Sequence, residues 1–187
     1  MTDRNIVLVG FMGTGKSTVG KILAKKLGRE LVDVDQRIEE KEKRRIAEIF
    51  EKDGEPVFRR LEKQMVRSVA SGSKLVITTG GGAVIDTENV SALKANGILV
   101  LLEAQPRTIY QRVKDSRHRP LLNLPAGQAG TQDMQSEIQR LLEARKPHYD
   151  RADLKCATDG KTAQQVADEI LRTLAHDGEF EFGKDWF

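Results

Sequence analysis

Apolar residues follow two patterns that alternate along this chain. Five short apolar runs, typical of buried parallel strands, occupy residues 6–9, 30–35, 75–79, 98–102 and 153–157. Between them apolar residues recur every three or four positions, which predicts helices after residue 16, over 55–71 and 87–95, from Pro106, over 136–146 and from 163 to 174. This alternation predicts an α/β fold, a three-layer sandwich around a mainly parallel five-stranded sheet.

Three stretches depart from this alternation. Residues 36–52 are dense in charge and have only a thin apolar face, which predicts short outer helices. Residues from about 113 to 131 combine several basic side chains with Pro125, Gly127 and Gly130, a composition that fits a mobile lid or an ordinary solvent loop equally well. Residues 176–187 carry no recognisable motif. We therefore expect a single domain over 1–175, followed by a tail of unknown role.

Composition narrows the class of protein. The 187 residues are 39% hydrophobic and 32% charged, which is ordinary for a globular protein long enough for one well-cored domain. A net charge of +3 gives no argument for a nucleic acid or a membrane as partner. The single cysteine, Cys156, excludes an intrachain disulfide and fits a reducing compartment. With no long apolar run in the chain, we expect a cytoplasmic, monomeric protein.

The strongest chemical signal follows the first predicted strand. Residues 10–17 read Gly-Phe-Met-Gly-Thr-Gly-Lys-Ser, the spacing of a phosphate-binding P-loop. Glycines let successive amide N–H groups converge on phosphate oxygens, Lys16 adds a positive charge, and the Ser17 hydroxyl is suited to Mg²⁺. Because a strand precedes this loop and an amphipathic helix follows it, a merely tight turn is a poor alternative.

Two further signals follow other predicted strands. Asp33 and Asp35 stand at the end of the second strand, and three glycines, Gly80 to Gly82, follow the third. Consecutive glycines are entropically costly, which favours close approach of the backbone to a ligand over a plain turn. Ligands of open parallel sheets bind at the carboxyl ends of the strands. We therefore expect the P-loop, the two aspartates and the glycines to meet at one edge of the sheet.

The helix over 55–71 carries one ambiguous pair. Glu62 falls within the apolar stripe of this helix, and Arg59 stands three residues earlier. A weak surface ion pair and a functional pair are equally compatible with this spacing. As a candidate for a binding role, Arg59 offers a guanidinium that can hold an anion through two parallel hydrogen bonds.

The reaction class follows from what accompanies the P-loop. The chain lacks the Asn-Lys-x-Asp motif that reads guanine and the strand-terminal Asp-Glu of many ATPase motors. A basic lid suits a kinase, which must exclude water from the transfer step. The acceptor of the phosphoryl group would meet Asp35, which can orient a hydroxyl and accept its proton.

Taken together, several motifs resemble the shikimate kinase family of P-loop proteins over about residues 5–175. The matching residues are the P-loop through Thr18, Asp33 and Asp35, Phe58-Arg59-x-x-Glu62, Thr79 to Gly82, Arg119-Pro120-Leu121-Leu122, and Arg145 before Pro147-x-Tyr149. The resemblance implies transfer of the γ-phosphoryl group of ATP to the 3-hydroxyl of shikimate, in aromatic amino acid biosynthesis. The span from 123 to 136 is longer than the family pattern, and the tail after Leu174 lies outside it.

The resemblance also implies a role for each matched residue. ATP and Mg²⁺ would be bound by Gly13, Thr14, Gly15, Lys16, Ser17 and Thr18, with Asp33 reaching the ion through water and Arg112 and the turn near Lys161 beside the adenine. Shikimate would be bound by Asp35, Arg59, Arg145 and the glycines Gly80, Gly81 and Gly82, between Phe50 and Phe58. Glu62 would hold Arg59. The catalytic residues would be Asp35, Lys16 and Arg119, the last acting from the lid.

Two other functions stay open at this point. A kinase for another small hydroxylated acid, such as gluconate, would use the same scaffold. A nucleotide-dependent regulatory module without transfer activity is the second, although the presence of Lys16, Ser17, Asp35 and Arg119 argues against it.

Overall fold

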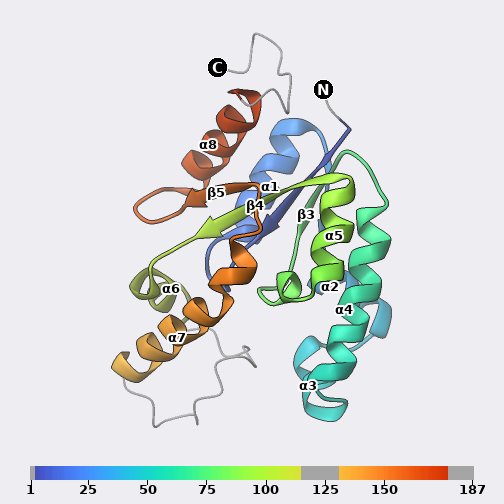
Figure 1. Ribbon diagram of the computed structural model, residues 1–187, viewed down its shortest axis with the longest axis vertical. Coiled ribbons are helices and arrows are strands. Elements are labelled where there is room, and N and C mark those ends of the chain that lie inside the picture. Colours follow the sequence, from blue (N-terminus) through green and yellow to red (C-terminus); the bar gives the residue numbers. More distant parts are fainter. Residues whose placement is uncertain (1–2, 115–130, 177–187) are drawn as a thin grey trace.

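The protein is described from a computed structural model, which places residues 3–114 and 131–176, with the side chains of 131–133 left aside. A sheet of five parallel strands runs through its centre (Figure 1). The strands are β1 (Asn5–Val9), β2 (Glu30–Asp33), β3 (Leu75–Thr78), β4 (Gly97–Glu103) and β5 (Leu154–Ala157), in the spatial order β2-β3-β1-β4-β5. All neighbouring strands are parallel, as the alternation of strands and helices predicts.

Helices follow every strand, and those after the first four complete the crossovers between strands. They are α1 (Lys16–Leu27), α2 (Val34–Glu42), α3 (Ile46–Lys52), α4 (Glu55–Ala70), α5 (Thr87–Ala95), α6 (Pro106–Val113), α7 (Thr131–Tyr149) and α8 (Ala163–His176), with a short 3₁₀ turn η1 (Ala83–Ile85). Helices α1 and α8 pack on one face of the sheet, and α4 and α5 pack on the other (Figure 1). This arrangement confirms the predicted three-layer α/β sandwich.

The central strand β1 shows how the sheet divides the core. Ile6 and Leu8 belong to the hydrophobic cluster beneath α1 and α8, whereas Val7 and Val9 belong to the cluster beneath α4 and α5. Successive side chains of a strand point to opposite faces, so a continuous apolar strand is buried on both sides. A third, smaller cluster around Phe11 joins the loop after β1 to α6 and α7.

The predicted second strand is too long at its carboxyl end. We expected strand over 30–35, but β2 ends at Asp33 and α2 begins at Val34, so that Asp35 lies in the first turn of a helix. Asp33 has an extended backbone and its side chain accepts a hydrogen bond from the Gln36 N–H at 3.1 Å, which caps the helix. An aspartate followed three residues later by glutamine is a helix-start signal that the sequence contained.

The helix predicted over 136–146 is longer at both ends. It begins at Thr131 and continues through Pro147 to Tyr149. Proline removes one helical hydrogen bond and disfavours helical geometry in the residue before it, which is why a stop was expected. Tyr149 is only 6% exposed and packs in the cluster beneath α4 and α5, so tertiary packing compensates for the lost bond.

The lid prediction lies largely outside the described residues. Val113 ends α6 and Thr131 begins α7, while Arg119 and the glycines and prolines between them fall in 115–130. Within the ranges 3–114 and 131–176, no helix combines the length and apolar character needed to cross a membrane.

Candidate active site

An open cleft of about 1220 Å³ lies along the carboxyl ends of the strands. It is lined by the P-loop, the start of α2, the inner side of α3 and α4, and the loop after β3. Pockets for a single small ligand usually measure about 300–1,000 Å³, so this cleft has room for two substrates. The prediction that the P-loop, the aspartates and the glycines meet at one sheet edge is confirmed, because all three line this cleft.

The donor half of the cleft is the P-loop. Gly13 and Gly15 have φ angles of 76° and 99°, which side chains other than glycine rarely adopt. The Lys16 ammonium donates to the carbonyl oxygens of Gly10 and Phe11 at 2.8 and 2.9 Å, and the Thr14 hydroxyl donates to Phe11 at 2.8 Å. The positive end of α1 therefore faces the cleft together with an ammonium group, a suitable environment for phosphate.

Oxygen ligands suited to Mg²⁺ stand beside the P-loop. Ser17 Oγ lies 3.4 Å from Asp33 Oδ2, and that same carboxylate oxygen accepts a hydrogen bond from Thr78 Oγ1 at 2.7 Å. The parallel register places Thr78 opposite Asp33 on the neighbouring strand. Hydroxyl and carboxylate oxygens are donors that Mg²⁺ accepts, so the residues present fit the ion that the P-loop implies.

Asp35 is the buried acid of the acceptor half. Its Oδ1 is buried and, among the described residues, accepts no hydrogen bond. Burial, followed by the negative charges of Glu62 and Asp33, raises the pKa of Asp35 to about 7, and Lys16 and Arg59 oppose this rise. A carboxyl group that titrates near neutral pH and has an unused acceptor oxygen is equipped to take a proton from a bound hydroxyl.

Arg59, which is half-buried, pairs with the fully buried Glu62, so the two do not form a pair on a solvated face. Glu62 is 1% exposed, and its Oε2 accepts from Arg59 Nη1 at 2.8 Å. Glu55 accepts from Nε and Nη2 of the same guanidinium at 3.0 and 2.9 Å. Burial raises the pKa of Glu62, and Arg59 offsets part of that rise. The two glutamates thus hold the guanidinium at the wall of the cleft, which decides the ambiguity of the spacing in favour of a positioned arginine.

A second guanidinium, that of Arg145 on α7, contacts the loop after β3. Arg145 of α7 is 7% exposed, and its Nη1 lies 3.4 Å from the Gly81 carbonyl oxygen. Its guanidinium carbon is 5.2 Å from the centre of the Phe11 ring, a cation-π contact. Within the described part of the chain, no carboxylate forms an ion pair with Arg145, and a buried cation of this kind is suited to an anionic ligand.

Aromatic side chains line one end of the acceptor half. The rings of Phe50 and Phe58 have centroids 4.8 Å apart, and the Arg59 guanidinium lies 5.3 Å from the Phe58 centroid. Both rings line the cleft. Apolar walls around a few polar groups are the usual composition of a small-molecule site.

Arg112 connects α6 to the donor half. Its Nη1 donates to the Gly13 carbonyl at 3.2 Å and to Thr158 Oγ1 at 3.0 Å, and its Nη2 donates to the Thr158 carbonyl at 3.1 Å. Thr158 and Lys161 line the cleft beside it. The predicted nucleotide-side residues therefore lie together.

The structure brings most of the predicted site residues together and adds others. Lining the cleft are Gly13, Thr14, Gly15, Lys16, Ser17, Thr18, Asp33, Asp35, Phe50, Phe58, Arg59, Gly80, Gly81, Gly82 and Arg112. Arg145 does not line it but contacts Gly81 from behind, and Arg119 lies outside the described residues. Sequence reasoning gave no role to Thr78, Tyr149 or Phe11, because their contacts join segments far apart in the chain.

Known proteins match this chain over almost its whole length. The family model described as shikimate kinase matches residues 12–175. A shikimate kinase of Persephonella marina is 45% identical over 168 residues, covering 90% of this chain and 97% of that protein. A shikimate kinase of Thermodesulfovibrio yellowstonii is 42% identical over 169 residues, covering 90% of this chain and 94% of that protein.

Solved structures agree with the sequence comparisons. The structure of shikimate kinase from Acinetobacter baumannii in complex with shikimate has a TM-score of 0.87 and 37% identity, covering 94% of this chain and 95% of that chain. A gluconokinase from Sinorhizobium meliloti has a TM-score of 0.59 and 17% identity, covering 96% of each chain, which shows a shared fold alone. With a P-loop, a buried acid and two positioned arginines at one sheet edge, this chain belongs to the shikimate kinase family, whose members are ATP-dependent kinases.

Proposed function

We propose that this chain transfers the γ-phosphoryl group of ATP to the 3-hydroxyl of shikimate, producing ADP and shikimate 3-phosphate for aromatic amino acid biosynthesis. The observation that carries the proposal is the acceptor half of the cleft. There a buried acid, Asp35, stands with Arg59 and beside Arg145, so that hydroxyl groups and a carboxylate can be recognised at once. Family membership supports the same substrate.

On the donor side, the amides of Gly13 to Thr18 would bind the phosphates of ATP, and Lys16 would turn from the loop carbonyls toward the outer phosphates. Ser17 would bind Mg²⁺ directly and Asp33 through water. The ion supplies charge neutralisation on the phosphates. Arg112 and the turn near Lys161 would lie beside the adenine, because they line the outer end of the donor half.

On the acceptor side, Arg59 and Arg145 would bind the shikimate carboxylate. Asp35 and the backbone of Gly80 to Gly82 would bind the ring hydroxyls, and Phe50 and Phe58 would pack against the ring. Glu62 keeps Arg59 in position through the 2.8 Å bond.

In the transfer step the 3-hydroxyl oxygen forms a bond to the γ-phosphorus, and the bond from that phosphorus to the bridging β–γ oxygen breaks. The hydroxyl proton passes to the Asp35 carboxylate, and the electron pair of the broken bond remains on ADP. Lys16 stabilises the charge that develops on the transferring group. Arg119, from the predicted lid, would add a second positive charge and help to exclude water.

The test is ADP release measured with a coupled assay, with shikimate and gluconate as alternative acceptors and with Mg²⁺ present or chelated. We expect turnover with shikimate, none above background with gluconate, and loss of activity on chelation. The phosphorylated product should carry its phosphate on the 3-oxygen by ³¹P and ¹H NMR. Turnover with gluconate but not with shikimate would overturn the assignment, and product from neither would favour a regulatory module. We also propose that the enzyme acts in the cytoplasm, since a single cysteine excludes an intrachain disulfide and fits a reducing compartment, and that it acts there as a monomer.

A further inference from the structure

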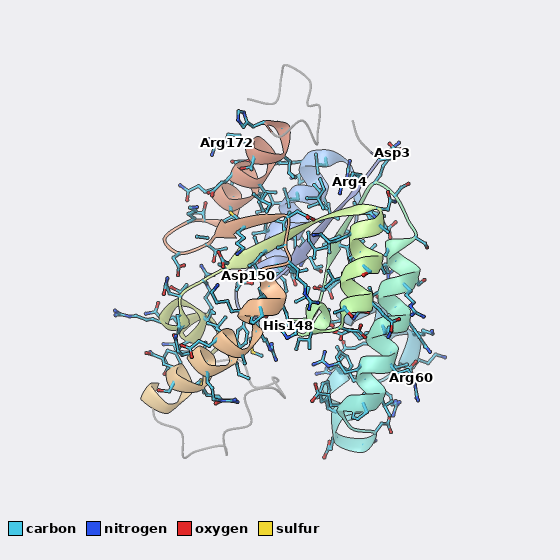
Figure 2. The ribbon with its side chains drawn as sticks, in the orientation of Figure 1. Asp3, Arg4, Arg60, His148, Asp150 and Arg172 are labelled. Carbon is cyan, nitrogen blue, oxygen red and sulfur yellow. The ribbon has the colours of Figure 1, made fainter. Side chains whose placement is uncertain are left out.

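Tyr149 makes a contact that the proposed chemistry does not use. This residue is 6% exposed at the end of α7, and its hydroxyl donates to the Gly81 carbonyl oxygen at 2.8 Å. Figure 2 shows this end of α7, marked by His148 and Asp150, in the middle of the molecule. Burial raises the pKa of Tyr149 and the neighbouring Arg145 guanidinium offsets only part of that rise, so the hydroxyl stays protonated and remains a donor over the working range of pH.

The accepted carbonyl belongs to the Gly81–Gly82 peptide, which lies between the two arginines. A Cβ atom added at Gly82 would stand 2.7 Å from both Nη1 and Nη2 of Arg59, and one added at Gly81 would stand 3.4 Å from Arg145 Nη1. Both guanidinium groups therefore rest against this one peptide. Its orientation decides how the two cations face the acceptor half of the cleft.

The same bond sets the direction of the Gly82 N–H. None of the described peptide bonds is cis, and in a trans peptide the N–H points away from the carbonyl of the same unit. Tyr149 holds the carbonyl on the side of α7, so the Gly82 N–H is directed to the opposite side, where Gly82 lines the cleft. Among the described residues this N–H has no hydrogen-bond partner, which leaves it available to a ligand.

Tyr149 and Arg145 both donate to the Gly81 carbonyl oxygen, but their hydrogen bonds differ in length. The Tyr149 bond measures 2.8 Å, whereas the Arg145 contact measures 3.4 Å and is weak. Arg145 can therefore leave the carbonyl for a carboxylate without releasing the peptide, because Tyr149 keeps it satisfied.

We propose that Tyr149 is a positioning residue of the acceptor site: its hydroxyl fixes the Gly81–Gly82 peptide against which Arg59 and Arg145 rest, and so frees Arg145 to bind the acceptor carboxylate. This inference rests on the proposed function. It is not a catalytic role, because Tyr149 does not line the cleft.

The test compares the parent enzyme with Tyr149→Phe, which keeps the ring and its packing. Tyr110→Phe is the matched control, since the chain has 2 tyrosines and Tyr110 lies on α6. Losing one hydrogen bond of this kind typically corresponds to about a three- to tenfold change in affinity. We expect Tyr149→Phe to raise the KM for shikimate by this factor, and to raise equally the Kd for shikimate measured by calorimetry without ATP. The kcat, the KM for ATP and all constants of Tyr110→Phe should stay within about twofold of the parent.

A second measurement keeps the proposal testable if Tyr149→Phe is poorly folded. In the Tyr110→Phe protein labelled with 3-fluorotyrosine, Tyr149 is the single labelled position, and its ¹⁹F resonance should shift when shikimate draws Arg145 from the shared carbonyl. Unchanged shikimate constants in a folded Tyr149→Phe protein, equal losses for ATP and shikimate, or an unmoved resonance would each overturn this inference alone. A parent enzyme that does not phosphorylate shikimate overturns the proposed function, and this inference with it.

Discussion

Asp35 and Glu62 bring their carboxyl groups together over the α-carbon of Gly80. A Cβ atom at that glycine would stand 2.9 Å from Asp35 Oδ1 and 3.1 Å from Glu62 Oε1. Among the described residues, neither oxygen accepts a hydrogen bond. Two buried acceptor oxygens side by side favour a ligand that supplies hydroxyl donors, and the negative charge of Glu62 helps to raise the pKa of Asp35, which increases its affinity for a proton.

Replacing Asp35 should separate catalysis from nucleotide binding. Asp35→Asn keeps the shape of the side chain but cannot accept the hydroxyl proton, so kcat should fall by about 10²–10⁴ while the Kd for ATP stays near the parent value. Lys16→Ala, by contrast, should impair both, because Lys16 is the residue proposed to bind the outer phosphates of ATP. Steady-state kinetics and calorimetric ATP titrations measure the two effects. Parent-like turnover in Asp35→Asn would remove this residue from the mechanism.

The raised pKa of Asp35 predicts how stability depends on pH. The unfolded carboxyl releases its proton near pH 3.8, whereas the folded one keeps it to about pH 7. The folded state therefore binds more protons in that interval, and this residue's stabilising contribution is lost as pH rises from about 4 to 7. The Tm of Asp35→Asn should therefore rise relative to that of the parent over the same pH interval, and the difference should stay constant above it. A stability difference of 1 kcal/mol corresponds to about 2–4 °C in Tm.

The Tm difference between the two proteins, followed by calorimetry from pH 4 to 8, checks this prediction. A difference that is constant with pH, or that shrinks toward pH 7, would contradict the burial argument. Activity gives a second check, since kcat/KM of the parent should rise with pH through about 7 as the free carboxyl ionises.

Two neighbouring arginines of α4, Arg59 and Arg60, provide a test substitution and a matched control for binding of the acceptor carboxylate. Arg59 is held by Glu55 and Glu62 at the cleft, whereas Arg60 is exposed and extends from the outer side of α4 (Figure 2). Arg59→Ala should raise the KM for shikimate by at least about tenfold, because a charge-assisted hydrogen bond contributes about 1.5–3 kcal/mol. Arg60→Ala should leave it unchanged. Equal effects of both substitutions would mean that only the overall charge matters.

Gly82→Ala tests the close approach of Arg59 to the backbone. Gly82 has a φ of −102°, which alanine adopts without strain, so the only cost is the added methyl group 2.7 Å from the guanidinium. Displacing Arg59 should raise the KM for shikimate severalfold and leave the KM for ATP and the Tm nearly unchanged. A variant with parent-like shikimate affinity would show that the guanidinium has room to shift.

Thr78→Val tests how the proposed metal site is organised. The substitution removes the hydroxyl that donates to Asp33 Oδ2 at 2.7 Å and keeps the volume of this 1% exposed side chain. Asp33 keeps its hydrogen bond from the Gln36 N–H but loses the one that fixes Oδ2, so the Mg²⁺ concentration needed for half-maximal ATP binding should rise by about tenfold. Ligand-orienting partners of metal sites typically contribute about 10- to 100-fold in affinity or activity. An unchanged Mg²⁺ dependence, measured by calorimetric ATP titration, would refute this role.

Local patterns were sufficient for most of the elements and for the donor half. The P-loop is a contiguous segment whose function depends on its own backbone, so its spacing alone identifies it. Helix α5 has the bounds predicted for it, and in the structure the Asp86 side chain caps its start by accepting from the Glu88 N–H. The strand predicted over 30–35 is wrong at its end, because Asp33 caps helix α2 and places Asp35 in its first turn.

The acceptor half depended on contacts that the sequence does not encode locally. The spacing of Arg59 and Glu62 is equally compatible with a surface pair and a functional pair; the family resemblance favours the second, and the burial of Glu62 against Gly80 rules out a fully solvated pair. Proline normally ends a helix, yet α7 continues past Pro147 because Tyr149 is buried and bonded to Gly81, 68 residues away in the chain.

By itself, the sequence determined the order of strands and helices, the phosphate-binding loop and the set of motifs that resemble one family. These depend on periodicity and on residue types within a few positions of each other. The tertiary structure decided which side chains share the Gly80 to Gly82 loop: Asp35 and Glu62 at its start, Arg59 over Gly82, and Arg145 and Tyr149 on Gly81. The physical reason is that burial and charge coupling act across space, between residues whose separation in the chain carries no local signal.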